Sequence, residues 1–293
     1  MALSIRQIIQ DKTDRLDSVP DALVSATQTA QRQIFKELVD LLDSLERDAK
    51  GQFLLSDKNF TIIEQIAGRM EQVVGKSEYD KALVQFAKEF NQQSQLSDLY
   101  FEKAMKGEFE TKKLYDSSLK LSQKNAIELL SKDIVAGGLI GEIKTILNTS
   151  VTTGQSFAQA VTSLRSAIEG NADIDGSMLR YVKTTAYDAF AVADRQYMEV
   201  VTQDLGLEWY LYFGDVIDDS RQFCIDRVGR YFHRQEVEGW GKIKDWQGRN
   251  YNTNSSTIFT YLGGYNCKHS LMPVRMEEVP PSAIKRAMNK KFV

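Results

Sequence analysis

Proline is almost absent from the interior of this 293-residue chain, and this absence most constrains its fold. The four prolines stand at positions 20, 273, 280 and 281, so residues 21–272 contain none. Because proline interrupts the hydrogen-bond ladder of a helix, such a stretch is typical of long uninterrupted helices. Apolar residues recur along it at spacings of three and four, as they do on one face of a helix. We therefore expect a mainly α-helical protein.

The helical pattern divides the first two hundred residues into segments with short breaks between them. We expect a short helix over 1–20 that ends before Pro20. Further helices are expected over 21–50, 96–106, 112–133, 142–148 and 177–204, and three more are expected to begin at 56, 77 and 156. Breaks are expected at the polar residues 92–95 and at the glycine-containing segments 107, 137–138 and 170–176. The apolar stripes suit a helical core, and the alternative is that one of them is a docking face for a partner.

The residues at the ends of some segments are suited to capping. Ser56 and Ser156 can accept hydrogen bonds from the first free N–H groups of a helix. Gly154 and Gly206 can adopt the left-handed conformation that ends one. These four positions therefore predict two helix starts and two helix ends.

The period of the pattern changes after Gly206. Large residues alternate there along a predicted strand, with Trp209, Leu211 and Phe213 on one face and Tyr210 and Tyr212 on the other. The fold class that we predict is mainly α, with a multi-helix N-terminal region followed by a small, loop-rich α+β module. The expected divisions are a helical region over 1–135 that serves docking or an unknown role, more helices over 136–206, the mixed module over 207–279 and a basic tail over 280–293.

Composition narrows the possible function classes. The net charge of −3 argues against a protein whose whole surface binds nucleic acid, although a local basic patch remains compatible with it. No apolar run approaches the roughly 20 residues of a membrane span, and the first residues lack the apolar core of a secretory signal. Walker loops, nucleophile elbows and zinc-protease helix motifs are not found. We therefore expect a protein that is not an enzyme, not in a membrane and not exported by the general route.

All cysteines and histidines of the chain lie between positions 224 and 269, as Cys224, His233, Cys267 and His269. Thiolate and imidazole are the ligands of tetrahedral zinc sites. We predict a structural zinc site formed by these four residues, with Asp219 as the alternative to His233. The sequence between 239 and 264 has few apolar residues, so a metal would replace a core there.

Two alternatives to zinc stay open. Cys224 and Cys267 would be buried reduced thiols beside hydrogen-bonded histidines, or they would form a disulfide if the protein matures outside the cell. Asp219 and Arg221 suit a catalytic pair, but we favour a structural turn in which the aspartate caps the turn and the arginine bridges to a carboxylate.

Two further stretches suit contacts with partners. Trp240, Trp246 and Tyr251 stand among glycines and basic residues, which suits stacking on nucleic acid and, as we prefer, a partner interface. The tail carries four basic residues and no acidic one, namely Lys285, Arg286, Lys290 and Lys291. We expect a solvated or frayed end, and the alternative is an arm that contacts phosphate or an acidic partner.

The order of these features resembles the phage head-morphogenesis family, also called Mu F-like minor head proteins. The resemblance covers about residues 140–275 and makes 136–206 the helices of the head-morphogenesis domain. The matching positions are Thr153, Gly154, Thr184, Trp209, Asp219, Arg221, Cys224, Gly229, Phe232, Asn266, Cys267 and His269. Many relatives have histidine in place of Cys224 and cysteine in place of His269, an exchange that keeps metal-ligand character. His233 matches no position of the family.

The resemblance implies a minor structural protein of a tailed-phage head. Such a protein would lie in the virion, inside the capsid at or near the portal, and in the host cytoplasm during assembly. It would act in head morphogenesis, DNA packaging or ejection, with the portal protein, the major capsid protein or both as partners and packaged DNA as a contact of the basic tail. The alternatives are a zinc-dependent hydrolase or nuclease acting on packaged DNA and a nucleic-acid-binding adaptor.

Overall fold

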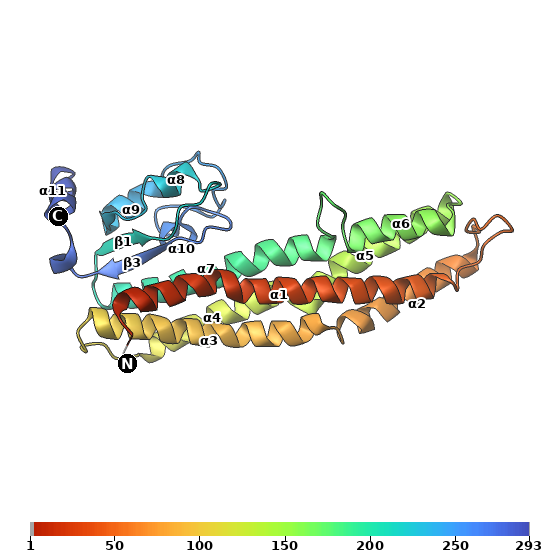
Figure 1. The fold of residues 1–293 in the computed structure, drawn as a ribbon, viewed down its shortest axis with the longest axis horizontal. Helices are drawn as coiled ribbons and strands as arrows, with labels where there is room; N and C mark the ends of the chain where they lie inside the picture. The colour runs from red at the N-terminus through yellow and green to blue at the C-terminus, as the bar shows by residue number, and fades with distance from the viewer. Residues whose placement is uncertain (1–2, 293) are drawn as a thin grey trace. The chain divides into compact units, whose positions relative to one another are not determined.

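The computed structural model describes residues 3–292, and it describes their side chains except those of 132–134 and 136. This part of the chain contains eleven α-helices and one three-stranded antiparallel sheet near its C-terminal end (Figure 1). The predicted fold class, mainly α with a small α+β module, is therefore confirmed. No helix among the described residues has the length and apolar character that crossing a bilayer requires.

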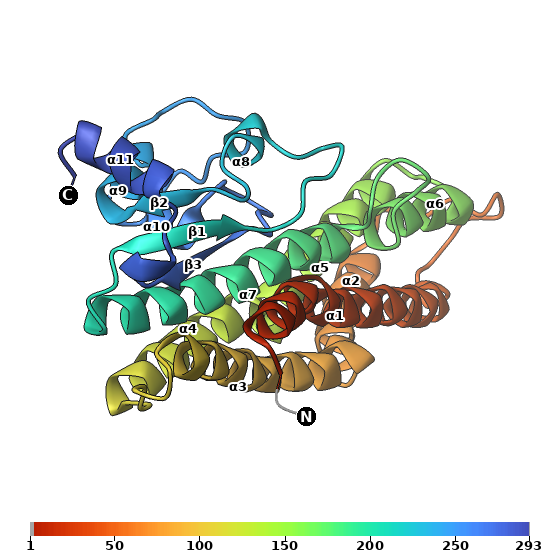
Figure 2. The same ribbon diagram turned by 60° about the vertical axis from the view of Figure 1, so that its left-hand side comes forward.

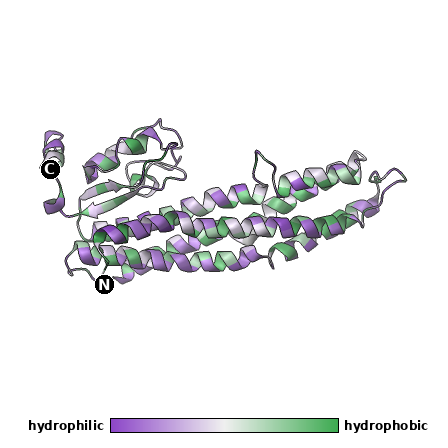
Figure 3. Cartoon of the chain, viewed as in Figure 1, coloured by the Kyte–Doolittle hydropathy of each residue, from purple (hydrophilic) through white to green (hydrophobic). Residues whose placement is uncertain are grey.

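Seven helices precede the sheet and contain most of the chain. They are α1 (Ile5–Leu42), α2 (Asp57–Val74), α3 (Glu78–Ala104), α4 (Lys113–Leu129), α5 (Lys132–Thr152), α6 (Phe157–Ile168) and α7 (Ser177–Asp204). Hydrophobic and hydrophilic residues alternate along these helices, as Figure 3 shows. In α2, for example, Ile63, Ile66, Met70 and Val73 are buried, and these residues belong to the apolar stripe expected from the sequence.

Three of the predicted breaks are wrong, because helices run through them. Helix α1 continues through Pro20, α3 through residues 92–95, and α5 through residues 137–138. A proline inside a helix costs about 3 kcal/mol, but Leu16 and Leu23 are buried on either side of Pro20, and burying them favours the continuous helix. The polar run at 92–95 continues the helix because its glutamine at 93 is buried and hydrogen-bonded.

The predicted caps are confirmed. The Ser56 side chain accepts the N–H of Asn59 at the start of α2, and Ser156 forms a capping box with Gln159 at the start of α6. Gly154 and Gly206 have φ angles of +62° and +65°, in the left-handed region that favours glycine.

The chain forms two compact units, and each is discontinuous in sequence. One unit contains Met1–Val19, Lys88–Ala126 and Tyr187–Val293, and the other contains Pro20–Ala87 and Ile127–Ala186. Helices α1, α3, α4 and α7 therefore contribute residues to both units.

In the second unit, α5 packs against α2 and α6. The Tyr79 hydroxyl donates a hydrogen bond of 2.7 Å to the carbonyl oxygen of Leu130. The Arg165 guanidinium lies over the ring of Phe35, 4.9 Å from its centroid. These contacts join segments that are remote in sequence.

In the first unit, parts of four helices pack together before the sheet begins. Buried Lys12 of α1 donates hydrogen bonds to Ser97 of α3 and to the carboxylate of Asp194 of α7. Helix α4 joins the group, because the Ser122 hydroxyl donates a hydrogen bond of 2.7 Å to the side-chain oxygen of Gln196 on α7.

The sheet has the strand order β2–β1–β3, with β1 (Trp209–Phe213) between β2 (Tyr231–His233) and β3 (Ser270–Val274) (Figure 2). The strand predicted at 209–213 is confirmed. Its large residues on both faces are explained by two apolar clusters. Tyr210 and Tyr212 belong to one cluster, and Trp209 belongs to the other.

Short helices complete this unit. They are α8 (Gln222–Ile225), α9 (Arg234–Trp240), α10 (Ile258–Tyr261), the 3₁₀-helix η1 (Met276–Glu278) and α11 (Pro281–Asn289). The expected frayed tail is wrong, because α11 buries Ala283 and Ala287 in the cluster of Trp209 and its Arg286 forms an ion pair with Glu236 at 3.1 Å. A docked helix forms backbone hydrogen bonds, apolar contacts and ion pairs that a frayed end does not form.

Candidate metal site

A short helix and a loop of the first unit bring Cys224, Cys267 and His269 together. Cys224 lies on the short helix α8, and the other two lie on the segment that leads into β3. Gly263 lies directly over the two thiols, since a Cβ atom there would stand 2.5 Å from Cys224 Sγ and 3.0 Å from Cys267 Sγ. Only glycine fits this position without displacing a sulfur atom.

The three ligand atoms are spaced as a tetrahedral metal site requires. Cys224 Sγ, Cys267 Sγ and a ring nitrogen of His269 all lie within 4.8 Å of one another, and the three residues are buried. Cys267 Sγ lies 3.7 Å from His269 Nδ1. With ordinary zinc bond lengths, sulfur and nitrogen at two corners of a tetrahedron stand roughly 3.6 Å apart. The cluster can therefore hold a metal ion with little rearrangement.

The contact between the two sulfur atoms shifts their pKa values in opposite directions. The contact with Cys224 lowers the pKa of Cys267, with help from His269 and Arg195, and the same contact together with burial raises the pKa of Cys224. The Tyr212 hydroxyl donates a hydrogen bond of 3.3 Å to Cys224 Sγ and supports negative charge there. A bound dication would displace the remaining proton, because thiolates are the species that bind metals.

Helix α7 supplies two residues that hold the segment 266–269 in place. Buried Arg195 donates hydrogen bonds to the backbone oxygens of Thr260, Cys267 and His269. The Asp188 carboxylate accepts the N–H of Asn266 at 2.6 Å. Burial raises the pKa of Asp188, against the lowering by this hydrogen bond.

The sequence analysis did not identify Arg195 and Asp188. A signal for them was present, because the two residues stand seven positions apart in the sequence of α7. This spacing places both on one face of a helix. An acidic and a basic residue on the same face of α7 indicate that this face contacts a polar loop.

The residues predicted as a structural turn take different roles. The Arg221 guanidinium donates to the carbonyl oxygens of Gly263 at 3.2 Å and Tyr265 at 2.5 Å, so the expected bridge to a carboxylate is wrong. Asn266 has a φ of +53° at the turn before Cys267, and Gly229 has a φ of +74° before β2. Arg221, which directly precedes α8, therefore binds the loop that carries Cys267 to the short helix that carries Cys224.

Asp219 lies at the mouth of the site. It is exposed and makes no hydrogen bond or ion pair in the described part of the chain, and the N–H of Ile217 is bound by the Ser220 hydroxyl instead. The expected capping by Asp219 is therefore wrong. Asp219 lines a cleft of about 450 Å³, which all three residues of the metal-competent group also line. Asp215 and Lys268 border the same cleft, and Lys268 Nζ forms an ion pair with Asp17 at 2.6 Å.

His233 lies apart from this group, contrary to the prediction that it is the fourth ligand. It precedes α9, where its Nδ1 accepts the N–H of Gln235 at 3.3 Å. Its Nε2 lies 3.4 Å from the carboxylate of Glu208. Both ring nitrogens have partners at the start of this helix, which explains why a histidine near the cluster in sequence does not take part in it.

The module has its own apolar core, so the expectation that a metal replaces a core is wrong. The core contains Tyr212, Phe223, Phe232, Trp240 and Phe259 among its buried residues. Trp240, predicted at an interface, is part of it, and Trp246 stacks on Phe223 with ring centroids 4.5 Å apart. Tyr251 alone of the three predicted aromatic contacts is fully exposed, at 80%. These aromatic residues lie on five short elements that are separate in sequence, so no helical or strand periodicity reveals the core that they form.

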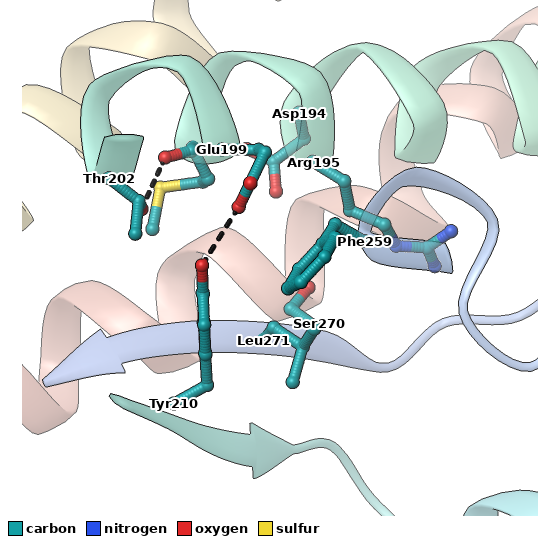
Figure 4. Close-up of a pocket in the computed structure, with 9 residues that line it drawn as sticks. Asp194, Arg195, Glu199, Thr202, Tyr210, Phe259, Ser270 and Leu271 are labelled. Carbon is teal, nitrogen blue, oxygen red and sulfur yellow. Dashed lines mark hydrogen bonds between the residues drawn. The ribbon is translucent and has the colours of Figure 1, made fainter. Parts of the chain in front are cut away.

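A second hollow lies beside α7 and the sheet (Figure 4). The carboxylate of Glu199 accepts the Tyr210 hydroxyl there at 3.0 Å and the Arg234 guanidinium at 2.7 Å. The hollow measures about 10 Å³, which is about the room that one water needs. We therefore assign it to packing, and the larger cleft lined by Asp219 is the candidate functional site.

Comparisons of this chain with protein-family models, with characterised proteins and with solved structures gave no match.

Proposed function

We propose that the chain is a minor structural protein of a tailed-phage head, located inside the capsid at or near the portal. The proposal rests on the resemblance to the Mu F-like minor head proteins. The observation that supports it is the convergence of motif residues remote in sequence. Cys224, Arg221, Asn266, Cys267 and His269 lie at one site, where Arg221 binds the backbone of Gly263 and Asp188 of α7 binds the backbone of Asn266. An accidental motif has no reason to converge in this way.

The partners that we propose are the portal protein, the major capsid protein or both. Packaged DNA receives less support as a contact of the C-terminal tail. Glu236 lies 3.1 Å from Arg286 and 3.2 Å from Lys290, so two of the four tail cations are already paired. Lys285 and Lys291 are the exposed cations that remain for phosphate.

The test is the protein composition of phage particles assembled with this chain. We expect it at low copy number in DNA-filled heads, and we expect it to co-purify with the portal protein. Its complete absence from particles, together with normal heads when it is deleted, would contradict the assignment. Heads that form but fail to package or eject DNA would place its role after shell assembly.

We also propose that the Cys224, Cys267 and His269 cluster binds Zn²⁺. Two thiolates and an imidazole favour zinc over Mg²⁺ or Ca²⁺, which prefer oxygen ligands. The support is the spacing of the three ligand atoms within 4.8 Å, with all three residues buried. Zinc would join α8 to the segment before β3, two parts of the module that are separated in sequence by β2, α9 and α10.

Metal analysis of the purified protein tests this proposal. We expect about one zinc per chain in the native protein and its loss in Cys267→Ser. The matched control is His233→Gln, which removes the histidine outside the cluster and should leave the zinc content unchanged. Native protein purified without zinc, and unable to take it up, would contradict the proposal.

A hydrolase remains the second candidate, because three protein ligands beside a cleft resemble a catalytic zinc site more than a closed structural one. The charges of the cleft do not favour DNA as its substrate. Three carboxylates line it, those of Asp17, Asp215 and Asp219, against two cations, Arg221 and Lys268, and the ammonium of Lys268 is paired with Asp17. Carboxylates repel phosphates, so a nuclease would have its acidic side facing the substrate.

A further inference from the structure

We propose that the fourth coordination position of the metal opens into the cleft and takes an exchangeable ligand, which is water or a neutral nitrogen donor. This inference rests on the proposed zinc site and adds a binding activity to it. A zinc ion with three protein ligands completes its tetrahedron with a molecule from outside.

No fourth protein ligand comes within reach in the part of the chain that the structure describes. The group with ligand atoms within 4.8 Å contains Cys224, Cys267 and His269 and none of the nearby aspartates. His233 caps α9, and both of its ring nitrogens have other contacts. The Tyr212 hydroxyl is a donor to Cys224 Sγ. It therefore stabilises a ligand.

The cleft gives the fourth position access to solvent. All three ligand residues line it, although each is at least nine-tenths buried. They therefore lie at its floor, whereas the exposed Asp215 and Asp219 lie at its rim. A volume of about 450 Å³ falls in the range of small-molecule sites, and it far exceeds the space of one water.

Charge selects the kind of ligand. Zn²⁺ with two thiolates and a neutral imidazole carries no net charge, so the metal itself attracts anions weakly. The Arg221 guanidinium is occupied by the carbonyl oxygens of Gly263 and Tyr265. Among the residues that line the cleft, Asp17, Asp215 and Asp219 carry three negative charges against the two positive charges of Arg221 and Lys268, so the lining has a net charge of −1 and disfavours an anionic ligand. A neutral donor such as imidazole meets none of this repulsion.

The experiment uses the full chain with Co²⁺ in place of Zn²⁺, because Co²⁺ bound to thiolates absorbs visible light in a way that depends on its ligands. Imidazole and azide are titrated separately at low ionic strength. We expect imidazole to change the visible bands in a saturable way. We expect the midpoint concentration of the azide titration to be about tenfold higher than that of the imidazole titration. Metal content measured after each titration verifies that the ion stays on the protein.

A pair of variants tests the charge argument. Asp215→Asn with Asp219→Asn should bring the azide midpoint close to that of imidazole, because both residues line the cleft. Asp218→Asn is the matched control, since Asp218 is exposed in the same loop but is not among the residues that line the cleft. The control should leave both midpoints unchanged.

The outcomes separate this inference from the zinc proposal. Protein that binds one Co²⁺ and responds to neither ligand has a closed fourth position, which overturns the inference and leaves the metal site intact. Azide that binds as tightly as imidazole to the native protein overturns the choice of ligand. Protein that takes up neither Zn²⁺ nor Co²⁺ overturns both proposals.

Discussion

At the scale of single residues, the candidate metal site depends on side chains that bind the backbone of its loops. Arg195 donates to the carbonyl oxygens of Thr260, Cys267 and His269, and Arg221 donates to those of Gly263 and Tyr265. A guanidinium has five donors in a fixed plane and can bind several carbonyls at once, which an ammonium cannot do in the same geometry. These hydrogen bonds therefore hold the segment 262–269, which has no regular secondary structure.

Gly263→Ala tests how tightly the two thiols are packed. A Cβ atom at this position would lie 2.5 Å from Cys224 Sγ, so either the sulfur or the backbone must move. We expect a loss of about 1–3 kcal/mol in the free energy of unfolding, as overpacking usually costs, and weaker zinc binding. Urea denaturation and metal content measure the two effects.

The matched control for this substitution is Gly239→Ala. A Cβ atom there would meet nothing within 4 Å, and the residue lies in α9. Because alanine favours helix over glycine by about 1 kcal/mol, the control should be neutral or slightly stabilising. Equal behaviour of the two variants would show that Gly263 is not constrained by the sulfur atoms.

At the scale of elements, the confirmed predictions concern features that depend on residues close to one another in the sequence. Ser56 and Ser156 begin helices and the alternating segment 209–213 is a strand, because capping and side-chain alternation act between near neighbours. Pro20 and residues 92–95 were misjudged as breaks, because tertiary packing there outweighs local preference. Of the predicted metal ligands, three converge and His233 does not, since a helix cap and a ligand look alike in sequence.

The docking of α11 gives a pH-dependent prediction. Burial would raise the pKa of Glu236, but the hydrogen bond and charge of Arg286, the N–H of His233 and Lys290 outweigh burial and hold the pKa below its ordinary value. A carboxyl group with a lowered pKa stabilises the fold above its unfolded-state pKa, and this stabilisation is lost as the pH falls through the folded-state pKa. The ion pairs of α11 should therefore weaken below about pH 4.5.

Glu236→Gln measures this contribution. At pH 7 we expect the variant to be less stable by roughly 2 kcal/mol, as for charge-assisted hydrogen bonds, and we expect the difference to shrink towards pH 3. Urea denaturation at both pH values gives the comparison. The control is Glu277→Gln, which removes an exposed partner of Arg275 and should change stability little at either pH. A difference that does not depend on pH would contradict the assignment of the effect to the carboxylate.

At the scale of the whole molecule, the chain forms its compact units from distant segments. The unit with the metal-competent cluster contains Met1–Val19, Lys88–Ala126 and Tyr187–Val293. A single sequence does not show which helices share a core, because every amphipathic face is equally apolar before it packs. A buried ion pair does distinguish partners, since a charge without its counterion is costly in the interior. Lys12 and Asp194 form such a pair between the first and third of these segments.

A double-mutant cycle on Lys12 and Asp194 tests whether this pair specifies the assembly of its unit. Lys12→Met leaves a buried carboxylate without its cation, and Asp194→Asn leaves a buried ammonium without its anion. Each single variant should lose about 3–5 kcal/mol in the free energy of unfolding. Lys12→Met with Asp194→Asn should recover most of that loss, because neither charge remains and the amide oxygen introduced at position 194 can still accept the 3.1 Å hydrogen bond from Gln93. The two partners are 182 positions apart, so recovery would show that these distant segments recognise one another through one matched pair. Strictly additive losses would mean that each residue acts alone and that apolar packing by itself selects the partners of α1.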